Sequence, residues 1–278
     1  MKLQPVVAGT FYPRDRKKLL EVMESFAGEP EVVLPGNDAV GMLLPHAGYA
    51  YSGSVAALGY RSLRASYETV VVAGPSHTFA FGGASLFSGE SVVTPLGEIP
   101  VDQETCRFLM EFDPGLAEIP PAFKREHSVE VHFPLIYHYL PGAKVVPIVM
   151  GQGTEQSVKP LAAALSALWK TKKFLLIASS DLSHYPSRDI ARNADREFLE
   201  ALLTGNEKKV GEADESLMSR KYPEFYCTHC GREPAAVLLR LAKAAGANKT
   251  KVLAYRNSGD VTGETSRVVG YGAVAFCK

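Results

Sequence analysis

The chain has 278 residues, 46% of them hydrophobic, and its 30 Lys and Arg residues are matched by 30 Asp and Glu residues. This balance gives no net field toward nucleic acid, and no apolar run approaches the ~20 residues that span a bilayer. We therefore expect a cytoplasmic protein that binds neither nucleic acid nor membrane. Four cysteines in a chain of this length do not resemble a disulfide framework and favour a reducing compartment.

Short β-rich runs alternate with longer helical patterns, which predicts an α/β fold with a mixed, largely parallel sheet flanked by helices. Apolar runs typical of strands buried on both faces occur at 40–44, 69–73, 144–150 and 174–178. Helical patterns occur at 54–63, 104–112, 156–169, 188–203 and 234–245. Residues 87–101 predict a hairpin, and two further strands are expected at 251–255 and 268–276. No linker or repeat divides the chain, so residues 1–278 are expected to form one domain.

Polar side chains follow three of the expected strands. The first strand leads into His46, the second into His77, and the fourth into Asp181 and His184. Because ligands of an open α/β sheet bind beyond the carboxyl ends of its strands, these side chains are expected to meet in one crevice. A single histidine would more often be a core or turn residue, but three together favour a site. We interpret His46 and His77 as metal ligands, and His184, oriented by Asp181, as an acid–base group.

The segment Cys227-Thr228-His229-Cys230 has the CxxC spacing of a structural zinc half-site or a redox motif. Both interpretations are weak, because no second CxxC and no thioredoxin-like unit accompany it. Cys230 stands just before a predicted helix, whose N-terminal dipole would favour the thiolate. Cys230 is therefore a candidate third metal ligand.

The segment Glu126-His127-Ser128-Val129-Glu130-Val131-His132 places two histidines five residues apart. This spacing does not put them on one helical face, so the segment is not a zinc-protease signature. Two interpretations of His127 remain equally open, a surface or capping histidine and a donor that reaches the pocket. We retain His127 as a candidate site residue.

Eight motifs, in order and nearly from end to end, resemble the Memo family. They are AGTFYP (8–13), PHAGYAYSG (45–53), GPSH (74–77), TPLGEIPVD (94–102), EHSVEVHFP (126–134), SSDLSHY (179–185), CGREP (230–234) and GYGAVAF (270–276). The resemblance implies a fold similar to the catalytic subunit of class III, non-haem iron extradiol dioxygenases, with a metal pocket at the sheet edge.

The resemblance also implies roles for individual residues. His46, His77 and Cys230 match the family's metal-ligand positions, and Asp181 and His184 match its polar pocket positions. In the pocket wall, the resemblance implies a place for two aromatic residues: Tyr51, and Phe11, which stands where the family often has tryptophan.

The implied ligand set differs from that of the dioxygenases, which hold iron with two histidines and a carboxylate. A thiolate in the third position moves the preference toward copper or zinc, while iron remains possible. We therefore expect one metal ion, with iron or copper favoured over zinc. In bacteria and archaea the family is associated with a radical-SAM protein, which implies a partner from the same pathway.

Three functions follow from this sequence. The first is a non-haem metal-dependent redox enzyme that resembles the extradiol dioxygenases and uses a His/His/Cys site. The second is a non-catalytic module that binds a small-molecule or peptide ligand in the retained pocket. The third is a zinc-dependent hydrolase.

Overall fold

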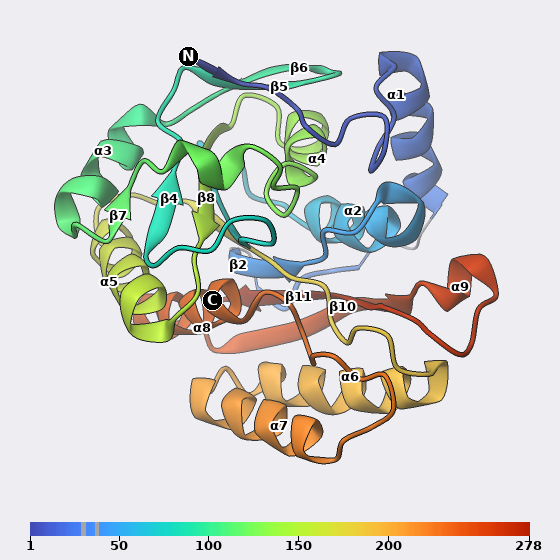
Figure 1. Ribbon diagram of the computed structural model, residues 1–278. Coiled ribbons are helices and arrows are strands. Elements are labelled where there is room, and N and C mark those ends of the chain that lie inside the picture. Colours follow the sequence, from blue (N-terminus) through green and yellow to red (C-terminus); the bar gives the residue numbers. More distant parts are fainter. Residues whose placement is uncertain (29–31, 37–38) are drawn as a thin grey trace.

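An eight-stranded mixed sheet runs through the centre of the molecule (Figure 1). The computed structural model describes residues 1–28, 32–36 and 39–278. In the large sheet the strands follow the order β10–β11–β2–β9–β3–β8–β4–β7. Their bounds are β2 Ala39–Leu44, β3 Thr69–Pro75, β4 Ala84–Leu86, β7 Leu116–Ala117, β8 Lys144–Met150, β9 Leu175–Ser179, β10 Lys249–Asn257 and β11 Gly270–Cys277. A second sheet has the order β1–β5–β6, with β1 Lys2–Leu3, β5 Ser91–Thr94 and β6 Gly97–Pro100.

Four neighbouring strands, β2, β9, β3 and β8, run parallel to one another. They confirm the four apolar runs predicted as central strands, and nearly all of their residues are buried. The predicted pair near the C-terminus is confirmed as β10 and β11, which are antiparallel. Because β2, β3 and β9 point the same way, the segments that follow them emerge at one edge of the sheet.

Helices cover both faces of the large sheet (Figure 1). On one face α8 and α6 contact the strands, with α5 and α7 packed beside them, while α2 covers the other face with α4 beside it. The bounds are α1 Arg16–Ser25, α2 Ser54–Arg61, α3 Gln103–Phe112, α4 His132–Tyr139, α5 Lys159–Leu168, α6 Arg188–Leu203, α7 Glu207–Ser219, α8 Arg232–Ala245 and α9 Gly259–Thr262. Short 3₁₀ turns occur at Phe26–Gly28 and Pro120–Phe123, and π-helical turns at Tyr49–Gly53 and Thr154–Val158.

Four of the described helices were not expected from the sequence: α1, α4, α7 and the four-residue α9. In α1 and α7 the polar residues dominate, and their starts depend on side-chain caps from Asp15 and Asn206. The short α4 is apolar almost all round, and Pro134 stands in its first turn, where the missing N–H costs no hydrogen bond. The predicted hairpin is confirmed as β5 and β6.

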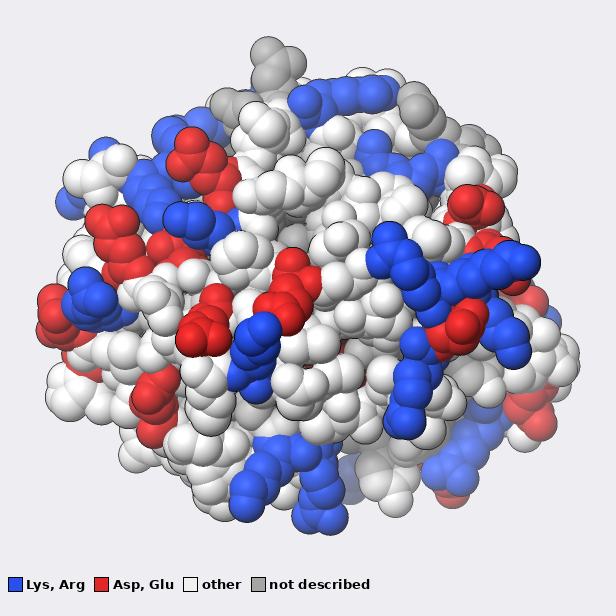
Figure 2. All heavy atoms as spheres, turned by 90° about the horizontal axis from the view of Figure 1, so that it is seen from above, with Lys and Arg blue, Asp and Glu red and all other residues white. Residues whose placement is uncertain are grey.

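The charged side chains of the surface are distributed as the balanced composition predicts. Acidic and basic side chains are interspersed over the face shown in Figure 2. In the described part of the chain, no helix combines the length and apolar character that crossing a bilayer requires. One hydrophobic core connects the sheets with the helices, so the chain folds as a single α/β domain with a mostly parallel sheet. Similarity to the class III extradiol dioxygenase fold stays a prediction.

Candidate metal centre

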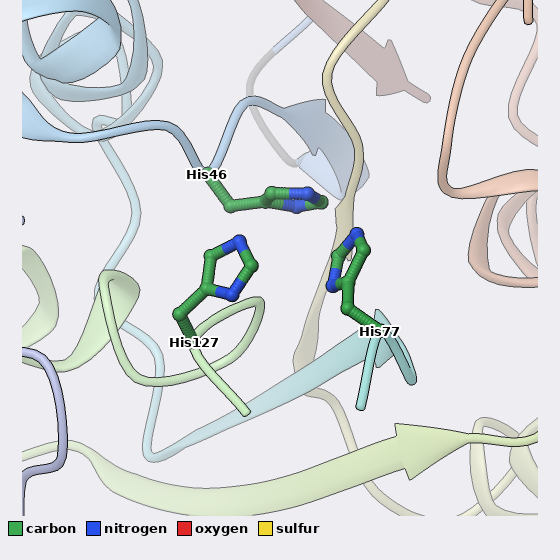
Figure 3. A group of neighbouring side chains, drawn as sticks. All are labelled: His46, His77 and His127. Carbon is green, nitrogen blue, oxygen red and sulfur yellow. The ribbon is translucent and has the colours of Figure 1, made fainter. Parts of the chain in front are cut away.

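The histidines that follow β2 and β3 meet at the carboxyl edge of the sheet, as the strand ends predict. His46 and His77 are joined there by His127, from the loop before α4 (Figure 3). One ligand atom from each of the three side chains lies within 4.8 Å of the others. Figure 3 shows the three imidazole rings pointing toward one another. His127 is thus part of the cluster itself, whereas the sequence indicated at most a donor that reaches the pocket.

His46 is the buried member of the cluster. Its side chain is almost fully enclosed, with only 2% of the residue exposed. Nδ1 lies 2.7 Å from Ser179 Oγ, and Nε2 lies 3.2 Å from Cys230 Sγ. Burial, followed by the neighbouring His77, lowers the pKa of His46 well below its usual range. The ring is therefore neutral at physiological pH, as a metal ligand must be.

His77 is held by a buried carboxylate. Glu126 accepts hydrogen bonds from His77 Nδ1 at 2.9 Å and from its backbone N–H at 2.5 Å. The backbone N–H groups of His127 and Ser128 donate to the same carboxylate, each at 2.9 Å. Burial alone would raise the pKa of Glu126, but these donors outweigh it and lower the pKa to about 2. Glu126 is an anion that leaves His77 Nε2 facing the cluster, the usual arrangement behind a metal-bound imidazole.

His127 completes the open side of the cluster. Its ring stacks on that of His77 with centroids 4.7 Å apart, and the ring of Phe11 lies 4.7 Å away on another side. Side-chain exposure is 30% for His77 and 21% for His127, so both reach solvent while His46 does not. Burial, then His77, lowers the pKa of His127 to about 4. The cluster thus has one enclosed wall and one side that is accessible to a ligand.

Cys230, which was a candidate because it precedes a predicted helix, lies against the enclosed wall of the cluster. Its Sγ contacts His46 Nε2, and its backbone N–H donates to the carbonyl of Asp181 at 3.3 Å. Burial opposes the helix dipole that was expected to favour the thiolate. Burial, and then the carboxylate of Asp181, raise the pKa of the Cys230 thiol well above its usual range. Without a metal the sulfur carries its proton.

Asp181 and His184 follow β9 into the same region but have separate partners. Asp181 Oδ1 accepts from the backbone N–H groups of His46, at 2.8 Å, and Ala47, at 3.3 Å. His184 Nδ1 lies 2.8 Å from the carbonyl of Leu182. The expected hydrogen bond between Asp181 and His184 is absent from the described residues, since a backbone carbonyl orients the imidazole instead. Burial raises the pKa of Asp181 to about 7.

The aromatic side chain of Phe11 contacts the open side of the cluster through His127. Tyr51 stands in the π-helical turn after His46 and is 41% exposed. Tyr185, next to His184, has a φ of 71°, a strained conformation for a non-glycine residue, and Arg267 stacks over its ring at 4.3 Å. These side chains could contact a bound ligand, so the pocket-wall roles of Tyr51 and Phe11 stay predictions.

The donor set fits a transition metal. Three imidazoles and one thiol suit copper, iron or zinc better than calcium or magnesium, which take oxygen ligands. Two ligands of one metal can stand at most about 4.2–4.6 Å apart, twice the bond length of ~2.0–2.3 Å. The observed separations within 4.8 Å therefore need only small rotations of the more exposed histidines. His46, His77 and His127 form the group that could hold a metal, and Cys230 contacts this group through His46.

Two residues of the site were not predicted from the sequence. Glu126 directly precedes His127, and an acidic residue inside a histidine-rich motif was the available signal. Ser179 lies at the end of β9, in a polar run from which only Asp181 and His184 were selected. Each contacts a histidine that lies far away in the sequence, and a local pattern does not reveal such a contact.

Comparison with known proteins identifies the family of this chain. The family model described as "Memo-like protein" matches residues 4–275. A MEMO1 family protein of Methanobrevibacter smithii is 35% identical over 99% of this chain and 100% of its own length. MEMO1 family proteins of Methanococcoides burtonii and Aquifex aeolicus are 37% and 34% identical, each over 98% of both chains. The chain belongs to the Memo-like protein family.

Proposed function

We propose that this protein is a non-haem metal-dependent redox enzyme. In this proposal His46, His77 and Cys230 hold one iron or copper ion, and His127 stands beside them on the open side. The observation that carries the proposal is the neutral, enclosed His46, whose Nε2 faces Cys230 Sγ at 3.2 Å within reach of two further imidazoles. When bound, a redox-active metal with an open position would supply electron transfer to O₂ or to a substrate oxygen.

The neighbouring residues can move protons at neutral pH. A carboxyl with a pKa near the operating pH is suited to general acid–base catalysis, and burial raises the pKa of Asp181 to about 7. Burial also lowers the pKa of His184, so its neutral Nε2 can accept a proton while Leu182 holds Nδ1. Asp181 and His184 would act as two separate groups, each oriented by backbone atoms.

The open side would receive the substrate. Tyr51, Phe11 and the ring of Tyr185 offer aromatic surface beside exposed imidazoles, which suits a small aromatic or peptide-like ligand. We propose a cytoplasmic setting, in line with the thiol state of Cys106, Cys227 and Cys230. A radical-SAM partner is proposed from family membership alone.

Metal content is the first test. Protein purified without oxygen should contain about one iron or copper per chain, and His46→Ala, His77→Ala and Cys230→Ser should each lose most of it. The control is His138→Ala, because His138 is exposed and lies outside the cluster. Stoichiometric zinc with no redox metal would instead support the hydrolase.

The third ligand can be identified by proton release. Because Cys230 carries its proton in the free protein, binding through the thiolate should release about one proton at pH 7, and Cys230→Ser should abolish the release. Cobalt(II) gives a second measurement, since a thiolate ligand adds a charge-transfer absorption that disappears in Cys230→Ser. If cobalt binds without this absorption in the wild type, and His127→Ala weakens the binding, three histidines hold the metal.

Turnover separates the enzyme from the binding module. Protein loaded with Fe(II) or copper should consume O₂ with a catechol or a reductant, and Cys230→Asp should rebuild a dioxygenase-like carboxylate set with a changed rate. A loaded protein that consumes no O₂, yet binds ligands at the cluster, would support the binding module.

A further inference from the structure

A fully buried chain of hydrogen bonds runs from the metal cluster into the core. Ser179 Oγ is its centre, with His46 Nδ1 at 2.7 Å, His132 Nε2 at 3.0 Å and the carbonyl oxygen of Ser128 at 2.6 Å. Beyond it, Tyr60 Oη lies 3.1 Å from His132 Nδ1. These five residues are each no more than 2% exposed, so water does not compete for their protons.

The proton positions in this chain follow from counting donors. A carbonyl oxygen has no proton, so the contact of 2.6 Å between Ser179 Oγ and Ser128 O requires the serine hydroxyl to donate there. The hydroxyl has one proton, and its remaining capacity is to accept. Both imidazole nitrogens beside it must then be N–H donors.

This count fixes the tautomer of each histidine. His132 carries its proton on Nε2, which leaves Nδ1 to accept from the hydroxyl of Tyr60. His46 carries its proton on Nδ1, which leaves a lone pair on Nε2, the atom that faces Cys230 Sγ. Every polar atom of the chain is thereby satisfied, as a buried network must be.

We propose that Ser179 is a positioning residue that presets His46 as the Nδ1–H tautomer and so keeps Nε2 ready to bind the metal. The same hydroxyl ties the end of β9 to Ser128, in the segment that carries His127 and Glu126. One oxygen atom thus sets both the proton on the enclosed ligand and the position of the loop behind the open ligands. This inference rests on the proposed metal site, but the tautomer itself can be measured without metal.

The first experiment uses metal-free protein. Two-bond ¹H–¹⁵N correlation spectra of the histidine rings should show His46 and His132 as opposite tautomers, Nδ1–H and Nε2–H respectively. In Ser179→Ala the Nδ1 proton of His46 loses its acceptor, so the Nε2–H form should become populated. A wild-type His46 already in the Nε2–H form, or an unchanged spectrum in Ser179→Ala, would overturn the proposal.

The second experiment measures affinity for cobalt(II) in competition with a chelator. Ser179→Ala should weaken binding on the order of 10–100-fold, the range found when an orienting partner of a metal-bound histidine is removed. Ser179→Thr keeps a hydroxyl and should recover most of the loss. Tyr60 is separated from Ser179 by two hydrogen bonds, through His132, so Tyr60→Phe should have a smaller effect than Ser179→Ala.

The matched control is Ser157→Ala. Ser157 is as buried as Ser179, and its hydroxyl donates to the carbonyl of Gly151 at 2.7 Å, with no hydrogen bond to His46, His77 or His127 within the described part of the chain. It should leave the cobalt affinity unchanged, and an equal loss would reduce the effect of Ser179 to general destabilisation and overturn the proposal. If wild-type protein binds no cobalt, the proposed function fails, while the tautomer measurement still decides the role of Ser179.

Discussion

Two buried carboxylates hold residues of the histidine cluster, and their pKa values are shifted in opposite directions. Glu126 accepts from the imidazole of His77 and from three backbone N–H groups, and the pKa falls to about 2 although burial opposes it. Asp181 accepts from only two backbone N–H groups, of His46 and Ala47, and burial raises the pKa to about 7. The donors around each carboxylate, and not its depth alone, therefore decide its charge.

The difference means that Glu126 keeps a fixed charge near neutral pH, whereas Asp181 can gain or lose a proton there. A permanent anion at Glu126 fixes the loop of His127 and orients His77, which requires that the carboxylate never change state near neutral pH. A carboxyl near its pKa, as at Asp181, can exchange a proton during a reaction. Pairs of carboxylates whose environments separate their pKa values in this way are typical of acid–base sites.

The largest expected effect is that of Glu126→Gln. The amide nitrogen of glutamine cannot accept, so some of the four N–H donors around Glu126 would be left buried without a partner. We expect a loss of about 3–5 kcal/mol in the free energy of unfolding, the range for breaking a buried charged network. Urea denaturation of metal-free protein measures it.

The control for this variant is Glu118→Gln. Glu118 also accepts from a backbone N–H and a hydroxyl, both of Ser88, but it is exposed. Water can replace those contacts, so the free energy of unfolding should hardly change. Equal losses in the two variants would show that burial of the Glu126 network contributes nothing special.

Acid should destabilise the metal-free protein through Glu126. Its folded pKa of about 2 lies below the ordinary value of 4.5, so its contribution is complete above about pH 5 and disappears as the pH falls toward 2. The loss should amount to roughly 3 kcal/mol at most. Unfolding free energies measured from pH 6 to pH 2.5 test this, and Glu126→Gln should lose less over the same range than the wild type.

Asp181→Asn should act in the opposite sense. The folded pKa of about 7 lies above the ordinary 3.8, so stability is lost as the pH rises from about 4 through 7, because the buried carboxyl must ionise. Asparagine has no such charge, and the variant should gain at most roughly 4 kcal/mol over wild type at pH 8 and little at pH 4. A variant equally stable relative to wild type at both pH values would show that Asp181 is already ionised at pH 4.

The sequence predicted the parts of this site that depend on local order. Apolar runs followed by His46 and His77 were sufficient to place both residues at one sheet edge, because parallel strands end together. The pKa of Cys230 was not predictable, since its burial comes from packing against segments far away in the chain. The roles of Ser179 and Glu126 were missed for the same reason, because the histidines that they orient, His46 and His77, lie more than 45 residues away in the sequence.

The smallest expected effect concerns a third buried carboxylate, Glu130, which has one donor fewer than Glu126 and no imidazole among its donors. Glu130 accepts from the hydroxyl of Tyr12 at 2.7 Å and from the backbone N–H groups of Val6 and Val7, at 2.7 and 3.0 Å. With three donors but no imidazole among them, the pKa of Glu130 is still raised, chiefly by burial. The imidazole of His77 is thus the donor that distinguishes Glu126.

Tyr12→Phe tests this conclusion. The phenol hydrogen bond favours ionised Glu130, so its removal should raise the pKa of Glu130 further and cost about 1–2 kcal/mol when the carboxylate is charged. The cost should therefore grow as the pH rises above the ordinary glutamate range. Tyr49→Phe is the control, because Tyr49 donates to the uncharged carbonyl of Val131 at 2.8 Å and its loss should not depend on pH. Unfolding free energies of both variants from pH 4 to pH 8 decide the point, since a cost of Tyr12→Phe that is constant with pH would mean that Glu130 never ionises in the folded protein.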